Sequence, residues 1–215
     1  MSSGDFAILW DLDGTLVDTV DDIAHAVDLT LTDFGLPTLG SARVRRHVGD
    51  GAARLVDACV TEAGGLPSEA HYLRFREVYR AHPRVTAECF PGIRSLLDWV
   101  PVPQAVVTNK PEDVTRALLD ALDLSHHFGA IVGGDTLPTR KPGPEPLRHA
   151  LRQLGATTGV MVGDGPQDVR AAHAAGLPVV GVTWGIHAPE GADCHVSTVL
   201  GLREALAARL PVEYR

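Results

Sequence analysis

The chain has 215 residues, of which 45% are hydrophobic and 21% are charged, so it can bury a globular core and is not a disordered polymer. Its net charge of −8 argues against a general nucleic-acid binder, which would present a basic face. The cysteines Cys59, Cys89 and Cys194 are widely spaced and suggest neither a disulfide framework nor a zinc motif, which favours a reducing compartment. Because we find neither a signal-peptide pattern nor an apolar run of membrane-spanning length, we expect a cytoplasmic protein that does not enter a membrane.

Short apolar runs recur along the chain, and most are followed by a stretch with one apolar stripe at helical spacing. The runs are continuously apolar rather than alternating, which indicates strands covered on both faces, as in a parallel sheet. Strands alternating with helices predict an α/β core with a doubly wound, mostly parallel, Rossmann-like sheet. The predicted strands are Phe6–Trp10, Ala105–Thr108, Ala130–Gly134, Gly159–Gly163 and Pro178–Val182.

The region from about Val17 to Pro83 breaks this alternation, because it shows helical signals and no convincing strand. We predict a small all-helical cap over residues 17–85, inserted into a discontinuous core of residues 1–16 and 86–215. Ser68 is the expected N-cap of its third helix. The three apolar faces are Val20, Ile23, Val27, Leu31 and Phe34, then Leu55, Val56, Cys59 and Val60, then Tyr72, Phe75 and Tyr79.

Polar residues follow the predicted strands at their carboxyl ends, where ligands bind in open α/β sheets. Taken singly, each has an ordinary explanation as a turn former, a first-turn acid or a surface lysine, and Lys110 is expected to be solvated. Acids after two strands, a hydroxyl after another and a lysine nearby together predict a site. The candidates are Asp11 and Asp13 after the first strand, Thr108 and Asn109 at the end of the second, Asp164 and Asp168 after the fourth, and Lys141 in a proline-rich loop.

Such a set of side chains suits phosphoryl transfer to a carboxylate nucleophile, which splits one difficult displacement into two easier ones. A phosphate dianion repels an anionic nucleophile, so a cation is needed between them, and Mg²⁺ prefers carboxylate and phosphate oxygens. A lysine adds fixed positive charge, and a threonine hydroxyl can hold a phosphate oxygen. A second carboxylate can protonate the leaving oxygen and later deprotonate water. The ten histidines, including His126 and His127, show no ligand spacing.

Four stretches resemble the motifs of the haloacid dehalogenase-like hydrolase superfamily: "DLDGTLVDT", "VVTNK", "RKPGPEPL" and "VGDGPQDVRAAHAAG". The resemblance covers essentially the whole chain. It implies that Asp11 is the nucleophile and Asp13 the acid/base. It also implies a Mg²⁺ ion on Asp11, the Asp13 carbonyl and Asp164, with support from Asp168.

The same resemblance implies that Thr108 and Asn109 hold the phosphoryl group and that Lys141 neutralises charge. The dehalogenases of the superfamily lack an acid at the position of Asp13, so its presence favours a phosphatase.

Within the superfamily the chain resembles the phosphoglycolate phosphatases, on the stretches "VRRHVGDGAARLV", "GGDTLPTRKPGPEPL" and "GVTWG". That family has a helical cap after the first strand. Two residues depart from its pattern, since Gly165 stands where serine is usual and Asp50 where asparagine is frequent. A phosphoglycolate carboxylate requires a cation on the cap side, and Arg45, with Arg43 behind it, is the candidate; a solvated helix face explains both arginines equally well.

We therefore predict a magnesium-dependent phosphomonoester hydrolase, a monomer or homodimer, whose first substrate to try is 2-phosphoglycolate. The same chemistry on a sugar phosphate, a nucleotide or pyrophosphate is the alternative, as is a sugar-phosphate mutase. A catalytically idle binding module is the alternative from another class, and the intact acid pair and lysine speak against it.

Overall fold

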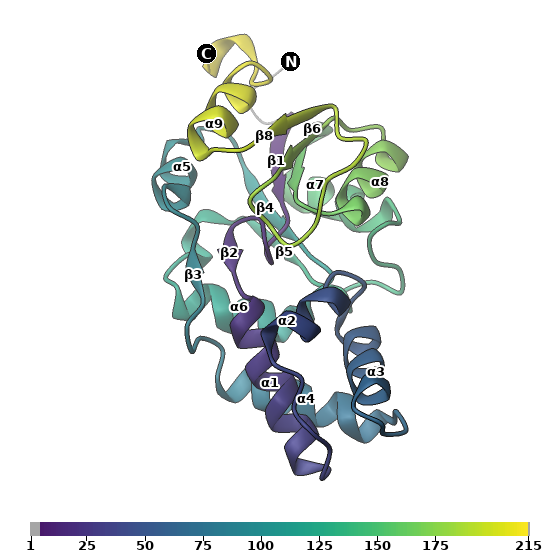
Figure 1. Cartoon of the computed structure of the whole chain (residues 1–215). Coiled ribbons are helices and arrows are strands. Elements are labelled where there is room, and N and C mark those ends of the chain that lie inside the picture. Colours follow the sequence, from purple (N-terminus) through teal and green to yellow (C-terminus); the bar gives the residue numbers. More distant parts are fainter. Residues whose placement is uncertain (1–4, 215) are drawn as a thin grey trace.

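The computed structural model describes residues 5–214, and its core is a parallel sheet (Figure 1). Residues 1–4 and 215, which the sequence prediction assigns to the core, lie outside the described residues. Within the described chain six strands form one sheet in the order β5-β4-β1-β6-β7-β8, and every neighbouring pair is parallel. The predicted α/β class is therefore confirmed. The strands are β1 (Phe6–Trp10), β4 (Gln104–Val107), β5 (Ala130–Val132), β6 (Thr158–Gly163), β7 (Val179–Val182) and β8 (Cys194–Val196).

Helices cover both faces of the sheet, which explains why the strands are apolar on every residue. In β1, Ile8 and Trp10 pack on one face with residues of α5, α6 and α9, whereas Ala7 and Leu9 pack on the other with residues of α7 and α8. Both faces of the central strand are thus removed from water, as in other doubly wound sheets. These helices are α5 (Ile93–Trp99), α6 (Glu112–Ala121), α7 (Glu145–Leu154), α8 (Pro166–Ala175) and α9 (Val199–Ala207), with 3₁₀ turns η2 (Ser125–His127) and η3 (Val212–Tyr214).

The inserted helices form a separate bundle beside the sheet, drawn at the bottom of Figure 1. They bury their own apolar cluster, in which Ile23 and Leu31 of α1 meet Leu55 of α3 and Phe75 of α4. We call this bundle the cap; its limits at residues 17 and 85 stay a prediction. Its elements are α1 (Val20–Asp33), α2 (Ser41–Val44), η1 (Arg45–His47), α3 (Ala52–Glu62) and α4 (Glu69–Ala81).

Three details of the cap differ from the sequence prediction. Val17–Asp18 is a short strand, β2, which pairs antiparallel with β3 (Glu88–Cys89); two residues are too few to leave a periodic signal. Phe34 follows the last turn of α1 and is 41% exposed, so it lies off the buried face. Ser68 is the N-cap residue of α4, as predicted, but its hydroxyl bonds the ring Nδ1 of His71 at 2.7 Å rather than a backbone N–H.

Asp22 joins the two chain segments that connect the cap to the core, namely the start of α1 and residues 85–87. Its carboxylate, at the start of α1, accepts hydrogen bonds from the backbone N–H groups of Val85, Thr86 and Ala87 and from the Thr86 hydroxyl. Burial opposes the ionised form, but these hydrogen bonds outweigh it and lower the pKa of Asp22.

Among residues 5–214, no helix combines the length and apolarity that a membrane span requires.

Candidate active site

A cavity lies between the carboxyl ends of β1, β4 and β6 and the cap. Strand β1 places Trp10 opposite Val106 of β4 and Val162 of β6, so the residues that follow these strands meet at one edge. The predicted site residues that line the cavity are Asp11, Asp13, Thr108, Asn109, Lys141, Asp164 and Asp168. The fold thus brings together seven side chains that are separated by up to about 157 positions in sequence.

Asp11 lies at the centre of a buried charge cluster. Its backbone N–H continues the β1–β6 ladder by donating to the carbonyl of Val162, at 2.8 Å. The Lys141 ammonium lies 2.8 Å from Oδ1 of Asp11 and 2.5 Å from Oδ1 of Asp168. One cation therefore bridges the acid after β1 and the acid in the first turn of α8.

Burial opposes the ionisation of the carboxylates in this cluster. Burial and the neighbouring Asp168 raise the pKa of Asp11 to about 6, despite the opposing effect of Lys141. Burial and Asp11 likewise raise the pKa of Asp164, and burial raises that of Asp168. Burial disfavours the charged form of Lys141 too, but Asp11 and Asp168 hold its pKa above the ordinary value. Three acids around one lysine leave an excess of negative charge that a further cation would neutralise.

Asp11, Asp164 and Asp168 fit a hard divalent cation. Each offers a carboxylate oxygen, and these oxygens lie within 4.8 Å of one another. The backbone around them leaves the carboxylates little freedom: a Cβ on Gly14 or Gly185 would come within 2.6 or 2.4 Å of Oδ2 of Asp164. All three ligand groups are oxygens, which suits Mg²⁺ better than a softer metal.

Asp164 is also held by its neighbours. Its Oδ2 accepts the backbone N–H groups of Ile186 and His187, at 2.6 and 3.1 Å, and its Oδ1 accepts the Thr15 hydroxyl at 3.2 Å. These partners come from the loop after β7 and the turn after β1. Sequence reasoning named neither, because hydrogen bonds of this kind depend on the tertiary fold.

Asp13 lines the same cavity but pairs with other side chains than those of the cluster. Its Oδ1 accepts the Thr19 hydroxyl at 2.7 Å and the Lys110 ammonium at 3.0 Å. The expectation that Lys110 is solvated is therefore wrong, since its side chain is only 3% exposed. An ion pair with Asp13 compensates for this burial.

Thr108 and Asn109 follow β4 at the floor of the cavity. The Thr108 hydroxyl accepts the backbone N–H of Lys110 at 3.2 Å. Asn109 donates its amide hydrogens to the carbonyls of Gly49 and Lys141, at 2.9 Å each, while its Oδ1 is buried without a partner in the described chain. Asn109 thus joins the cap loop to the lysine loop.

The structure does not bring Arg45 into the cavity. Its exposed guanidinium donates to the carbonyl of Gly185 at 2.7 Å, outside the lining. Arg43, behind it, pairs with Glu62 at 2.7 Å. Among the described lining residues the side-chain cations are Lys110 and Lys141, with no arginine. Arg45 thus lies outside the lining of this cavity, and a contact between Arg45 and a substrate carboxylate stays a prediction.

The two departures from the family pattern lie at the cavity rim. The Gly165 N–H donates to Oδ2 of Asp168 at 3.0 Å, and a Cβ there would first meet Oε1 of Gln167 at 2.8 Å, the end of a flexible side chain. Asp50 is exposed and accepts a hydrogen bond from Nε2 of Gln167 at 2.9 Å, outside the lining. Gln167 therefore fills the space beside both positions.

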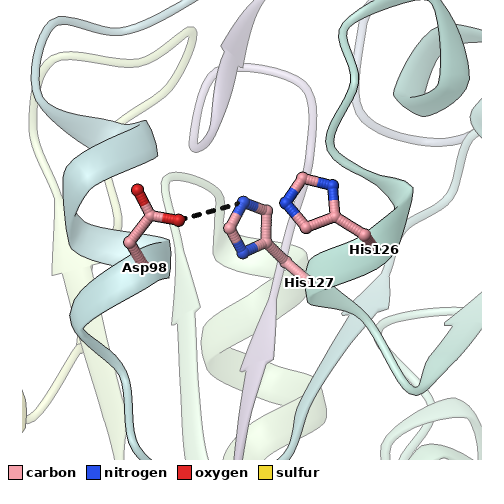
Figure 2. Close-up of side chains that lie close together, drawn as sticks. All are labelled: Asp98, His126 and His127. Carbon is pink, nitrogen blue, oxygen red and sulfur yellow. Dashed lines mark ion pairs between the residues drawn. The ribbon is translucent and has the colours of Figure 1, made fainter.

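A second group of potential metal ligands consists of other residues, which are more exposed than the acids of the cavity. Figure 2 shows Asp98 of α5 facing His127 of η2, with His126 beside it, a grouping that linear spacing could not reveal. The Asp98–His127 distance is 3.7 Å, and the side chains of Asp98 and His126 are 70% and 60% exposed. Burial and His126 lower the pKa of His127. Unlike the acids of the cavity, two of its three residues are exposed, and exposed acidic groups are common without a metal ion.

Comparison with known proteins agrees with the site. The model of the haloacid dehalogenase-like hydrolase family matches residues 8–182. A phosphoglycolate phosphatase of Chromobacterium violaceum is 39% identical over 212 residues, covering 93% of this chain and 96% of that protein. Another, of Neisseria meningitidis, is 41% identical over 189 residues, covering 83% of this chain and 80% of that protein.

A solved structure extends the similarity to three dimensions. The crystal structure of a predicted phosphoglycolate phosphatase from Haemophilus somnus matches with a TM-score of 0.83 at 27% identity, covering 95% of this chain and 99% of that one. The family match runs from within β1 to the end of β7 and includes every acid and lysine of the cavity. The chain therefore belongs to the haloacid dehalogenase-like hydrolases and is a phosphatase of that family.

Proposed function

We propose that the protein hydrolyses small phosphomonoesters through a phosphorylated Asp11, with Mg²⁺ as cofactor and 2-phosphoglycolate as substrate. The observation that carries the proposal is the Asp11 carboxylate, held at the floor of a cavity by Lys141 and surrounded by two further acids. A carboxylate fixed in this way is an oriented nucleophile.

Asp11, Asp164 and Asp168 are the side chains that would hold Mg²⁺, and the Asp13 carbonyl is the remaining ligand implied by the family resemblance. The bound ion would neutralise the excess negative charge and orient the phosphoryl oxygens. Lys141, fixed between two acids, adds a permanent positive charge at the same place.

In the first half-reaction an Asp11 oxygen forms a bond to phosphorus while the bond from phosphorus to the leaving oxygen breaks. Asp13 gives its proton to that oxygen, so the alcohol leaves neutral. In the second half-reaction water attacks the same phosphorus, its proton passes to Asp13, and the Asp11 carboxylate is released. The Thr108 hydroxyl lies at the cavity floor, where it can donate to a phosphoryl oxygen.

The choice of 2-phosphoglycolate is supported by the relatives that carry its name. The cavity itself favours a small substrate, because the cap closes over the sheet edge through apolar residues such as Leu55 and Phe75. Among the described residues that line the cavity, none is an arginine of the cap. Because no described lining residue is an arginine that could bind a substrate carboxylate, another small phosphoester is the second candidate substrate.

The test is a phosphate-release screen over small phosphoesters, followed by trapping of the intermediate. We expect release from 2-phosphoglycolate that stops on exhaustive chelation and returns with Mg²⁺ but not with Ca²⁺, which takes more oxygen ligands in a less strict geometry. Acid-quenched, labelled protein should carry phosphate on Asp11. Phosphate found on serine, threonine or histidine, or full activity after chelation, would refute the mechanism; preference for another ester would change only the substrate.

A further inference from the structure

The chain contains just two lysines, Lys110 and Lys141, among 19 lysine and arginine residues. Both are buried, with 6% and 3% of the whole residue exposed, and both line the cavity. Lys141 has a role in the proposed chemistry. Lys110 has none in it, although burying an ammonium is costly unless its partners compensate.

The partners of Lys110 come from both sides of the cavity. On the core side, its Nζ lies 3.0 and 3.3 Å from the two carboxylate oxygens of Asp13. On the cap side, the hydroxyl oxygen of Tyr79 in α4 lies 2.7 Å away, and the ammonium also lies 4.2 Å from the centre of that ring. Three acceptor atoms thus lie within hydrogen-bond distance of an ammonium that has three hydrogens.

We propose that Lys110 is a positioning residue that holds Asp13 for proton transfer, and that Tyr79 makes this arrangement depend on the seated cap. The proposal rests on the function proposed above. Lys110 acts through Asp13 rather than on the phosphoryl group. When Asp13 gives its proton to the leaving oxygen it becomes a carboxylate, and the adjacent ammonium stabilises the charge that develops.

Tyr79 is suited to the coupling role. Its side chain is fully buried among cap residues and packs edge-on against Phe75, with 5.6 Å between ring centres. Burial and the nearby Asp13 raise its pKa well above the ordinary value, so the ring presents a neutral hydroxyl at physiological pH. If α4 moved away, Lys110 would lose one hydrogen-bond acceptor and the face of the ring that covers it.

The kinetic test compares an alkyl and an aryl phosphate, because p-nitrophenolate leaves without needing a proton. The two esters differ only in the first half-reaction, so the rate to compare is the formation of phosphorylated Asp11 in rapid-quench measurements. We expect Lys110→Met to lower this rate on 2-phosphoglycolate by about ten- to a hundredfold and on p-nitrophenyl phosphate by less than about fivefold. Tyr79→Phe keeps the ring and removes the hydroxyl, so it should give the same pattern with a loss of about two- to tenfold. Tyr72→Phe is the matched control, since it removes a hydroxyl from the same helix outside the lining and should change neither rate.

A double-mutant cycle decides whether Lys110 works through Asp13. In an Asp13→Asn background, Lys110→Met should cost less than about threefold, because the group that it positions is already disabled. Equal losses on the two substrates, or a full loss retained in the Asp13→Asn background, would overturn the proposal and make Lys110 a phosphate or substrate ligand. Tyr79→Phe tested in the same cycle keeps the question decidable if Lys110→Met fails to fold.

An NMR measurement that needs no turnover tests the Lys110 contacts independently of the proposed phosphatase function. Protein labelled with ¹⁵N-lysine should give two side-chain ammonium signals. Asp13→Asn and Tyr79→Phe should each shift the Lys110 signal and leave that of Lys141 nearly unchanged. Those shifts in a protein without phosphatase activity would refute the proposed function alone; their absence would refute the contact and with it the positioning role.

Discussion

The wall of the cavity formed by the sheet edge carries four carboxylates and two ammonium groups, whereas the wall formed by the cap is almost entirely apolar. Ile23, Val48, Leu55 and Phe75 supply that second wall, and the Tyr79 hydroxyl is its polar group. The difference indicates that the reacting groups belong to the core and that the cap lowers the local dielectric. In such a site each charge on the opposite wall interacts more strongly than it would in water.

The largest expected effect is at the centre of the charged wall. Asp11→Asn should abolish turnover, because an amide cannot form the acyl-phosphate, while the size and packing of the side chain are preserved. Phosphate release and the trapped intermediate should both fall below detection, with an unchanged circular dichroism spectrum as the control for folding. Turnover near the wild-type rate would assign the nucleophile elsewhere.

Asp13→Asn should have the second largest effect, a loss of about 10²–10⁴-fold in kcat on 2-phosphoglycolate. Both half-reactions need its proton transfer, whereas its Thr19 hydrogen bond can be kept by the amide oxygen. Rapid-quench measurements should show slow formation of phosphorylated Asp11 and slow breakdown. A variant that forms the intermediate at full speed would limit Asp13 to the hydrolytic step.

The connection between cap and core is tested by a substitution of Asp22. Asp22→Asn removes a carboxylate that accepts bonds from Val85, Thr86 and Ala87, so we expect a loss of about 1–3 kcal/mol in the free energy of unfolding. Because the folded pKa is lowered, this stabilisation is fully present above the unfolded value of 3.8 and is lost as the pH falls through the folded pKa.

Denaturant titration of the wild type and of Asp22→Asn from pH 7 downward should therefore show a difference that shrinks below pH 3.8. Asp21→Asn is the matched control, since Asp21 is exposed and bonds only the Ser41 hydroxyl among the contacts described. A difference between wild type and Asp22→Asn that stays constant with pH would show that the charge of Asp22 is not what stabilises the linkers.

The smallest expected effect is at the outer edge of the cap. Arg45→Ala removes an exposed hydrogen bond to the Gly185 carbonyl, so we expect about a two- to tenfold loss of kcat/KM, equal on 2-phosphoglycolate and p-nitrophenyl phosphate. Equality would assign Arg45 to seating the cap. A loss confined to 2-phosphoglycolate would instead make it a ligand of the substrate carboxylate.

The charged wall could be predicted from sequence and the contacts across the cavity could not. Asp11 and Asp164 each follow a strand, and Lys141 lies in the loop before α7, so their meeting at one edge follows from the geometry of a parallel sheet. Lys110 and Tyr79 carry no such signal, because their meeting depends on how the cap sits over the sheet.

The same reason explains which cap contacts the sequence could not predict. The apolar stripes predicted α1, α3 and α4, but periodicity says nothing about where a charged residue beside a stripe will point. Arg45 extends to a core carbonyl and Asp22 to the linker, both across distances in sequence of more than 60 positions. Short elements such as β2 and β8 also carry too few residues for a pattern.

The burial of both lysines has a practical consequence for chemical labelling. In the folded protein neither side-chain amine is presented to solvent, so amine-directed reagents can reach Lys110 or Lys141 only through an opening of the cavity. The rate at which a small acylating reagent modifies each lysine, read by mass spectrometry, would then measure how frequently the cavity opens. A bound substrate analogue that holds the cap in place should slow both reactions. The modification rates of the two amines would then report how frequently the cap moves away from the sheet edge.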